Sequence, residues 1–220
     1  MLSDKRIIIL SGHYGSGKTN VAVNLSLSAK KDYEKVTLAD LDIVNPYFRS
    51  KDSELELEKN GVRLICSPYA NSNVDIPALP QEIYAVTDDK TSKTFVDVGG
   101  DDRGALALGR LTPEILKENS YEMLLVVNSF RPLTPTPESA VEVAREIENA
   151  CKLKFTGVIN NSNLGEFTTE ADVLGSVDYA SGVARILGVP VVLTTVSSKL
   201  YGALKDKIEN LYPLVLQKKI

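Results

Sequence analysis

Seven short apolar runs recur along the chain, each four or five residues long, and none of them alternates apolar with polar positions. Such runs are typical of strands buried on both faces of a parallel sheet. Gly, Pro, Asn or Asp stands at most of their ends, which favours strands over buried helix segments of similar length. The predicted strands are residues 6–10, 36–39, 62–66, 94–98, 123–127, 156–159 and 189–193.

The stretches between these runs carry apolar residues at helical spacing, most clearly over residues 18–30, 138–150 and 200–212. Strands that alternate with helices indicate an α/β fold. We therefore expect a doubly wound, mostly parallel seven-stranded sheet flanked by helices. Because no internal repeat or linker interrupts the pattern, we expect one domain over residues 1–220.

Composition removes several classes of protein. The 25 Lys and Arg residues against 29 Asp and Glu residues give a net charge of −4, so we expect no nucleic-acid partner. The longest aliphatic runs have four residues, whereas a membrane span needs about 20, so we expect no stable membrane insertion. The sequence has only two cysteines, far apart, and one histidine, which excludes a Cys- or His-rich metal site within one chain. The low cysteine content and the lack of a signal peptide in this sequence predict a cytoplasmic protein.

The segment GHYGSGKT, from Gly12 to Thr19, fits the phosphate-binding pattern G-x-x-x-x-G-K-[ST] between a predicted strand and a predicted helix. Glycines let the backbone approach phosphate oxygens, and successive N–H groups at a helix N-terminus face an anion. Lysine supplies a charge to the β- and γ-phosphates, and the threonine hydroxyl ligates Mg²⁺. The sequence thus predicts a P-loop nucleotide-binding fold; the predicted nucleotide-binding residues are Gly12, His13, Tyr14, Gly15, Ser16, Gly17, Lys18, Thr19 and Asn20.

Carboxylates follow two of the predicted strands, in the segments LADLD and FVDVGGD. The carboxyl ends of parallel strands meet at one edge of a sheet, so Asp40, Asp42 and Asp97 should gather near the phosphate loop. Asp97 precedes two glycines, a pattern that indicates a magnesium-side aspartate followed by a sensor of the γ-phosphate. We expect Thr19, Asp40 and Asp97 to form the metal site.

These motifs together resemble the MinD/ParA-type ATPases, the CobQ/CobB/MinD/ParA nucleotide-binding domain of the SIMIBI class, a larger group that includes signal-recognition GTPases and biotin-pathway synthetases. The resemblance covers nearly the whole chain and rests on residues 11–20, 37–46, 95–100, 157–161 and 187–192.

The resemblance implies ATP and Mg²⁺ as cofactors. It implies that Lys18 and Asp42 are catalytic, with Asp42 polarising the attacking water, and that Asp40 and Asp97 order the magnesium shell. It also implies that Asn161 contacts adenine, because an amide both donates to and accepts from that base. The guanine-reading pattern N-K-x-D is absent from residues 160–163, which read NNSN.

One position departs from the family's pattern. Its signature lysine, which reaches the nucleotide of the partner subunit, is replaced by His13, and the glycine that usually follows is replaced by Tyr14. Histidine is shorter and mostly neutral above its ordinary pKa near 6.5. We therefore expect a weak or altered ATP-dependent homodimer.

Further residues follow strand ends and are secondary candidates. Arg49, Arg103 and Arg131 could reach phosphates, with Arg103 the best placed after the two glycines. Residues 67–80 form a predicted functional loop. The apolar stripe of residues 200–211 is expected to pack rather than to bind membranes, because its polar face mixes both charges.

The sequence therefore predicts a slow Mg·ATP-dependent ATPase acting as a nucleotide switch, with an unidentified protein or small molecule as partner. Two alternatives stay open. One is a synthetase that phosphorylates a small carboxylate, as in dethiobiotin or cobyrinate chemistry, and the other is an ATP-binding module that does not turn over.

Overall fold

A computed structural model describes residues 4–42, 53–66, 81–100 and 102–216. In this part of the chain eight strands form one parallel sheet, in the order β3-β2-β4-β1-β5-β6-β7-β8. The strands are β1 (Ile7–Ser11), β2 (Val36–Asp40), β3 (Val62–Ile65), β4 (Lys93–Asp97), β5 (Tyr121–Val127), β6 (Gly157–Asn160), β7 (Val191–Ser197) and β8 (Leu211–Leu214).

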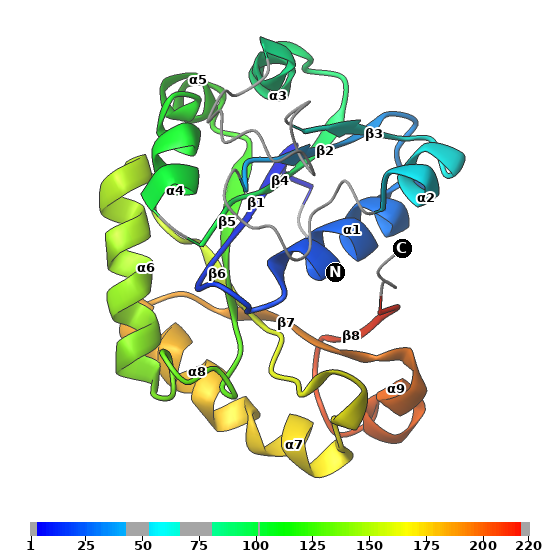
Figure 1. The fold of residues 1–220 in the computed structure, drawn as a ribbon, viewed down its shortest axis with the longest axis vertical. Helices are drawn as coiled ribbons and strands as arrows, with labels where there is room; N and C mark the ends of the chain where they lie inside the picture. Colours follow the sequence, from blue (N-terminus) through cyan, green and yellow to red (C-terminus); the bar gives the residue numbers. More distant parts are fainter. Residues whose placement is uncertain (1–3, 43–52, 67–80, 101, 217–220) are drawn as a thin grey trace, which may run out of the picture.

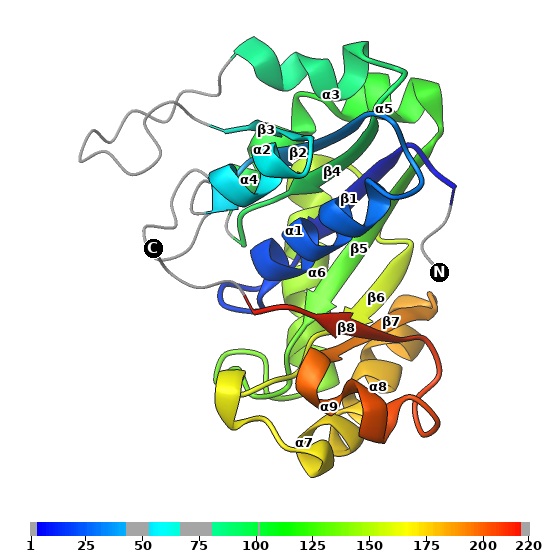
Figure 2. The same cartoon turned by 90° about the vertical axis from the view of Figure 1, so that its right-hand side faces the viewer.

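Helices cover both faces of the sheet (Figure 1). Helices α1 and α2 lie on one face, and α3, α4, α5, α6 and α8 lie on the other. Figure 2 looks onto the face that α1 and α2 cover. The helices are α1 (Lys18–Ala29), α2 (Glu54–Lys59), α3 (Ala85–Asp88), α4 (Asp102–Gly109), α5 (Thr112–Glu118), α6 (Pro137–Cys151), α7 (Glu170–Gly175), α8 (Val177–Leu187) and α9 (Ser198–Leu204), with 3₁₀ turns η2 (Gln81–Tyr84) and η3 (Gly165–Phe167).

The doubly wound α/β architecture is confirmed, and its core explains the continuous apolar runs. In β1, Ile7 and Ile9 pack into the cluster on the α6 side, whereas Ile8 and Leu10 pack into the cluster on the α1 side. All four side chains have no exposed surface. Because successive side chains of a strand point to opposite faces, a strand covered on both sides must be apolar at every position.

Seven of the eight strands coincide with the predicted runs within a few residues, and the helices predicted over 18–30 and 138–150 are present. Helix α6 begins with a capping box, in which Thr136 and Ser139 each accept a hydrogen bond from the other's backbone N–H, and Pro137 occupies its first turn.

The helix predicted over residues 200–212 is wrong, and so is the strand count of seven. Helix α9 ends at Leu204, a turn follows, and β8 pairs with β7 through Leu211 to Leu214. The apolar stripe misleads because Leu200, Leu204, Ile208 and Leu211 do pack into one cluster, although they do so from a helix, a turn and a strand. Asn210 adopts a left-handed φ of 56°, which ends any helical path before β8.

Strand β8 lies at the outer edge of the described sheet and is also tied to α1. The backbone N–H of Val215, just beyond the strand, donates to Asn24 Oδ1 (2.8 Å), and the Val215 carbonyl accepts from Asn24 Nδ2 (3.0 Å). Pro213 lacks a backbone N–H, which suits an edge strand. None of the described helices has the length and apolar character needed to cross a bilayer.

At the amino end of the strands, Arg6 binds several elements at once. Its guanidinium donates to the carbonyl oxygens of Val86 (2.9 Å) and Asp89 (3.1 Å) and to both carboxylate oxygens of Glu118. The Arg6 and Glu118 side chains are only 12% and 14% exposed. Hydrogen bonds from Arg6, joined by one from Lys90, lower the pKa of Glu118 from its usual 4.5 to about 2. The pair therefore joins β1, α3 and α5.

We predict that Glu118→Gln lowers the free energy of unfolding at pH 7 by about 1–3 kcal/mol, because a charged hydrogen-bonded partner of a mostly buried arginine is lost. The folded-state pKa lies below the unfolded one, so this contribution is present above about pH 4.5 and is lost as the pH falls towards 2. Urea unfolding of both proteins at pH 7, 4 and 3 should show the difference between them shrinking with pH.

The matched control is Glu114→Gln on the same helix, where a carboxylate that is 56% exposed forms one ion pair with Lys117. An exposed pair of this kind contributes about 0–1 kcal/mol. An equal loss of stability in the two variants would contradict the role given to Glu118.

Candidate nucleotide-binding site

The predicted phosphate loop connects β1, in the middle of the sheet, to the first turn of α1. Two of its glycines have no room for a side chain. At Gly12, with φ 149°, a Cβ would lie 2.4 Å from the carbonyl oxygen of Val126 in β5, and at Gly17, with φ 86°, it would lie 2.3 Å from Asn161 Nδ2. The loop therefore packs directly on the ends of β5 and β6, and its left-handed turns leave backbone N–H groups available to an anion.

Lys18 and Thr19 open helix α1 and are 6% and 7% exposed. The Lys18 ammonium group folds back over the loop, with Nζ 3.4 Å from the carbonyl oxygen of His13. The Thr19 hydroxyl donates to Asp97 Oδ2 at 2.6 Å. The loop and the end of β4 are thus joined by a buried hydrogen bond between two predicted metal-site residues.

The third predicted metal-site residue lies next to them. Asp40 ends β2 and is in register with Asp97 of β4, which in turn is in register with Leu10 of β1. Both carboxylates are buried, at 7% and 1% exposed. The structure therefore brings Thr19, Asp40 and Asp97 to one point at the carboxyl edge of the sheet, as the strand order requires.

Asp42 follows this cluster at the end of the described segment. Its backbone N–H donates to Asp40 Oδ1 at 2.9 Å, and the intervening Leu41 donates its N–H to the carbonyl oxygen of Asp97 (2.8 Å). Leu41 is fully buried, whereas Asp42 is partly exposed. These hydrogen bonds hold the backbone of Asp42 close to Asp40 and Asp97.

Gly100 brings the segment after β4 against the loop. A Cβ at this position would lie 2.6 Å from the backbone nitrogen of Tyr14 and 2.7 Å from the carbonyl oxygen of Gly12. Only glycine allows this approach without displacing backbone. Gly100, the second glycine after Asp97, is therefore in contact with the predicted phosphate loop, where a sensor of the terminal phosphate is expected to lie.

His13 and Tyr14 form the outer part of the loop. His13 Nδ1 lies 2.8 Å from the Tyr14 carbonyl oxygen, so the ring turns onto its own loop, and Tyr14 is 50% exposed. A homodimer bridged through this position stays a prediction.

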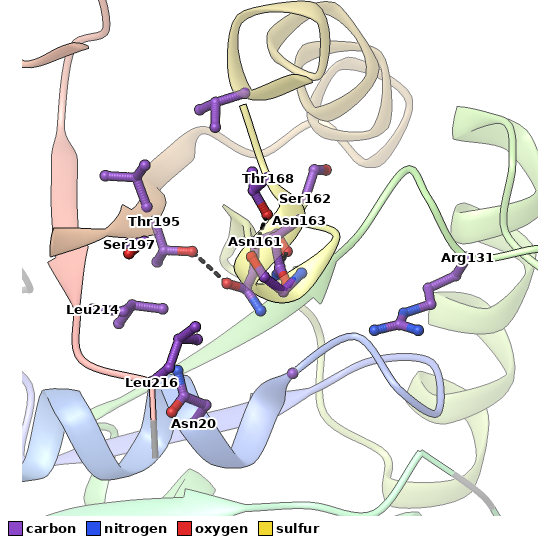
Figure 3. Close-up of a pocket in the computed structure, with 14 residues that line it drawn as sticks. Asn20, Arg131, Asn161, Ser162, Asn163, Thr168, Thr195, Ser197, Leu214 and Leu216 are labelled. Carbon is purple, nitrogen blue, oxygen red and sulfur yellow. Dashed lines mark hydrogen bonds between the residues drawn. The ribbon is translucent and has the colours of Figure 1, made fainter. Parts of the chain in front are cut away.

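Asn161 follows β6 and lies beside the loop rather than at its mouth (Figure 3). Its Nδ2 donates to the carbonyl oxygen of Ser16 at 2.7 Å, and its Oδ1 accepts from the hydroxyl of Thr195 in β7 at 2.6 Å. The side chain is 4% exposed. Its amide therefore holds the loop in place, a role that sequence reasoning did not assign, and one of its two N–H groups is committed to Ser16.

A cavity of about 230 Å³ opens beside Asn161. Its wall is built by the start of α1, the segment after β6 and the ends of β7 and β8 (Figure 3). The polar groups in this wall are amides and hydroxyls with one guanidinium, and the described lining contains no carboxylate. The lining residues are Gly17, Asn20, Arg131, Asn161, Ser162, Asn163, Gly165, Thr168, Val173, Thr195, Val196, Ser197, Leu214 and Leu216.

Sequence reasoning found Asn20 and Asn161 in this wall but missed the β7–β8 side. Thr195 and Ser197 stand in a polar run that follows the predicted strand 189–193, which was an available signal. Leu214 could not be placed while residues 200–212 were expected to be helical. Arg103 lies exposed in α4, and Arg49 and the predicted loop of residues 67–80 lie outside the described residues.

The residues present fit a phosphate chain and Mg²⁺. The loop offers backbone N–H groups, a lysine ammonium and the N-terminus of a twelve-residue helix to an anion. One hydroxyl and two carboxylates supply the oxygen ligands that Mg²⁺ takes. The loop and the oxygen cluster are joined by the Thr19–Asp97 hydrogen bond, so phosphate and metal would be bound side by side.

No protein-family model matches the chain, and no curated protein matches it. Solved structures do. The cell division protein FtsY from Thermotoga maritima superposes with a TM-score of 0.59 at 18% identity, over 90% of this chain and 63% of that one. Chloroplast FtsY from Physcomitrella patens gives 0.58 at 18%, over 88% and 59%. The signal recognition particle receptor FtsY from Elizabethkingia anophelis, in complex with GDP, gives 0.50 at 16%, over 90% and 59%.

The chain thus spans about 60% of the length of these proteins. At this level of identity the likeness speaks for the fold alone. The chain has the fold of a P-loop nucleoside triphosphatase.

Proposed function

We propose that the protein binds Mg·ATP at the loop of residues 12–19 and hydrolyses it slowly, as a nucleotide switch of the MinD/ParA-like group. The observation that carries this proposal is the buried hydrogen bond from Thr19 to Asp97, because it joins a lysine-bearing phosphate loop to a carboxylate cluster. Binding of a phosphate group requires only the loop, whereas hydrolysis of ATP also needs a metal site and an oriented water molecule.

Each residue has a defined task in this proposal. The loop N–H groups and Lys18 hold the β- and γ-phosphates, and Thr19, Asp40 and Asp97 would hold Mg²⁺, which neutralises phosphate charge when bound. Asp42 accepts a hydrogen bond from the attacking water and orients it towards the γ-phosphate. Gly100 packs against the backbone of Gly12 and Tyr14, and in this proposal a bound γ-phosphate would change that contact.

The cavity beside Asn161 is the proposed site of the base. Amides and hydroxyls can pair with the donor and acceptor on the adenine edge, and no residue in the described part of the chain accepts from the second N–H of Asn161. Guanine presents two N–H donors on its pairing edge, which a carboxylate would satisfy best, and the described lining has none. The lining therefore supports ATP.

GTP is the second candidate, and the observation that favours it is the fold likeness to an FtsY structure in complex with GDP. Against it, residues 160–163 of this chain lack the guanine-reading pattern N-K-x-D. A competition experiment between ATP and GTP distinguishes the two candidates.

Lys18→Ala should weaken Mg·ATP binding by about tenfold or more, because charge-assisted hydrogen bonds contribute about 1.5–3 kcal/mol. Isothermal titration calorimetry measures the change. Lys31→Ala, an exposed lysine beyond the end of α1, is the matched control and should bind as the parent protein does. Unchanged affinity in Lys18→Ala would contradict the proposal that the nucleotide binds at this loop.

Asp42→Ala should retain ATP but lose turnover by about 10²–10⁴-fold, because its task is to orient water and not to hold phosphate. Asp97→Asn is the contrast, since it should raise the Mg²⁺ concentration needed for binding. The measurement is the release of phosphate with no metabolite added. Release by the parent protein under these conditions indicates hydrolysis, whereas a synthetase would need its acceptor and a module without turnover would release none. Parent-like hydrolysis by Asp42→Ala would contradict the assignment.

ATP should displace a bound fluorescent adenine nucleotide at a concentration about tenfold or more below that of GTP, because unmatched buried polar groups cost about 1–3 kcal/mol. The competition is run with the parent protein and with Lys18→Ala as the control for specific signal. Equal or tighter displacement by GTP would favour the second candidate and remove adenine from the proposal.

A further inference from the structure

Arg131 lies in the segment between β5 and α6, residues 128–136, next to the phosphate loop. Strand β5 is the neighbour of β1, with Leu124 in register with Leu10 and Leu125 with Ser11, so the segments that leave these two strands run side by side. The strand order places this segment on the opposite side of β1 from β4 and Asp97.

The backbone around Arg131 is fixed from both ends. Its N–H donates to the carbonyl oxygen of Asn128 (3.1 Å), and its own carbonyl accepts from the N–H of Thr134 (3.1 Å). Asn128 Oδ1 accepts from the N–H groups of Phe130 (3.0 Å) and Asn163 (3.3 Å). The direction in which the Arg131 side chain leaves the chain is therefore set by the fold.

A buried tyrosine completes this anchoring. The hydroxyl of Tyr179 in α8 donates to the carbonyl oxygen of Thr134 at 2.8 Å. Burial raises the pKa of Tyr179 above its ordinary value, so its hydroxyl stays protonated and continues to donate at neutral pH. Helix α8 thus holds the far end of the Arg131 turn.

The guanidinium group lies flat against the phosphate loop. Measured from the position that a Cβ would take on Gly15, Arg131 Cζ and Nε are 3.5 Å away and Nη1 is 3.7 Å away. Three atoms of one plane at nearly equal distance mean that the face of the group, and not its edge, is turned to Gly15. Arg131 also lines the cavity together with Gly17 and Asn20, and Figure 3 shows its side chain pointing from the β5 segment towards the loop.

This cation has no counter-charge among the described residues. Its Nε is buried and has no hydrogen-bond partner there, and no carboxylate in the described part of the chain pairs with it. A buried donor left without a partner costs about 1–3 kcal/mol. The group also lies against Gly15 of the loop that leads into α1, whose N-terminus carries a positive partial charge, so an anion bound at the loop would be attracted by both.

We infer that Arg131 is a ligand of the nucleotide's phosphate chain, supplied by the same subunit, and that it contacts the phosphate nearest the base. This inference rests on the proposed nucleotide site and deepens it. The side of contact follows from the strand order, because Arg131 stands on the cavity side of the loop and the metal-site carboxylates stand on the other. The planar guanidinium can donate two parallel hydrogen bonds to phosphate oxygens.

The test is titration calorimetry of ADP and of ATP, each with Mg²⁺, using the parent protein, Arg131→Ala and Arg131→Gln. Both variants should lose about tenfold or more in affinity, by the same factor for ADP and ATP, because both nucleotides keep the phosphate nearest the base. Arg110→Ala, an exposed arginine after α4, is the matched control and should bind as the parent does. Melting temperatures without nucleotide should not fall in any of the three variants, since no described hydrogen-bond partner is lost and the Arg131 variants remove a buried donor without a partner.

The outcomes separate this inference from the function on which it rests. If the parent protein binds neither nucleotide, the proposed function fails. If it binds both, and Lys18→Ala weakens binding while Arg131→Ala and Arg131→Gln do not, only the role of Arg131 fails. A loss of affinity for ATP but not for ADP would place the Arg131 contact at the γ-phosphate and would contradict a contact with the phosphate nearest the base. A lowered melting temperature in both Arg131 variants would show a structural role instead.

Discussion

The hydrogen bond between the Thr19 hydroxyl and Asp97 is the interaction on which the arrangement of the candidate site depends. It is buried, it joins residues 78 positions apart in the chain, and it closes the gap between the first turn of α1 and the end of β4. Ordering the two side chains costs conformational entropy. The hydrogen bond therefore adds to stability only when the sheet already holds the end of β4 next to the start of α1. The parallel order of β2, β4 and β1 does this by placing Asp40, Asp97 and Leu10 in one row.

The sequence was sufficient where the local pattern allows only one structure. Continuous apolar runs predicted seven strands because those strands are covered on both faces, and the glycine-lysine-threonine motif predicted the loop because its chemistry lies within eight consecutive residues. The meeting of Asp40 and Asp97 could also be foreseen, since parallel strands share a carboxyl edge. In these cases the local signal and the tertiary structure demand the same residues.

The remainder depends on contacts between distant segments. Residues 200, 204, 208 and 211 show helical spacing, yet they reach one cluster through a helix, a turn and a strand, so spacing alone could not separate these paths. Asn161 was predicted to contact adenine. Nothing in the local sequence indicates that its amide also forms hydrogen bonds with Ser16 and Thr195. The turn that positions Arg131 depends on Asn128, Thr134 and Tyr179, which become neighbours only after β5, α6 and α8 have packed.

The way the sheet ends at β8 bears on how the protein behaves at high concentration. A free strand edge offers a ladder of donors and acceptors to which another chain can add, and this is a common route to aggregation. Here the edge strand has four residues, one of them is a proline without an N–H, and the next backbone unit has both its groups bound by Asn24 of α1. These features leave fewer groups of this edge for an incoming strand, so the segment that contributes Leu214 and Leu216 to the wall of the cavity also limits edge-to-edge association between molecules through Pro213 and Val215.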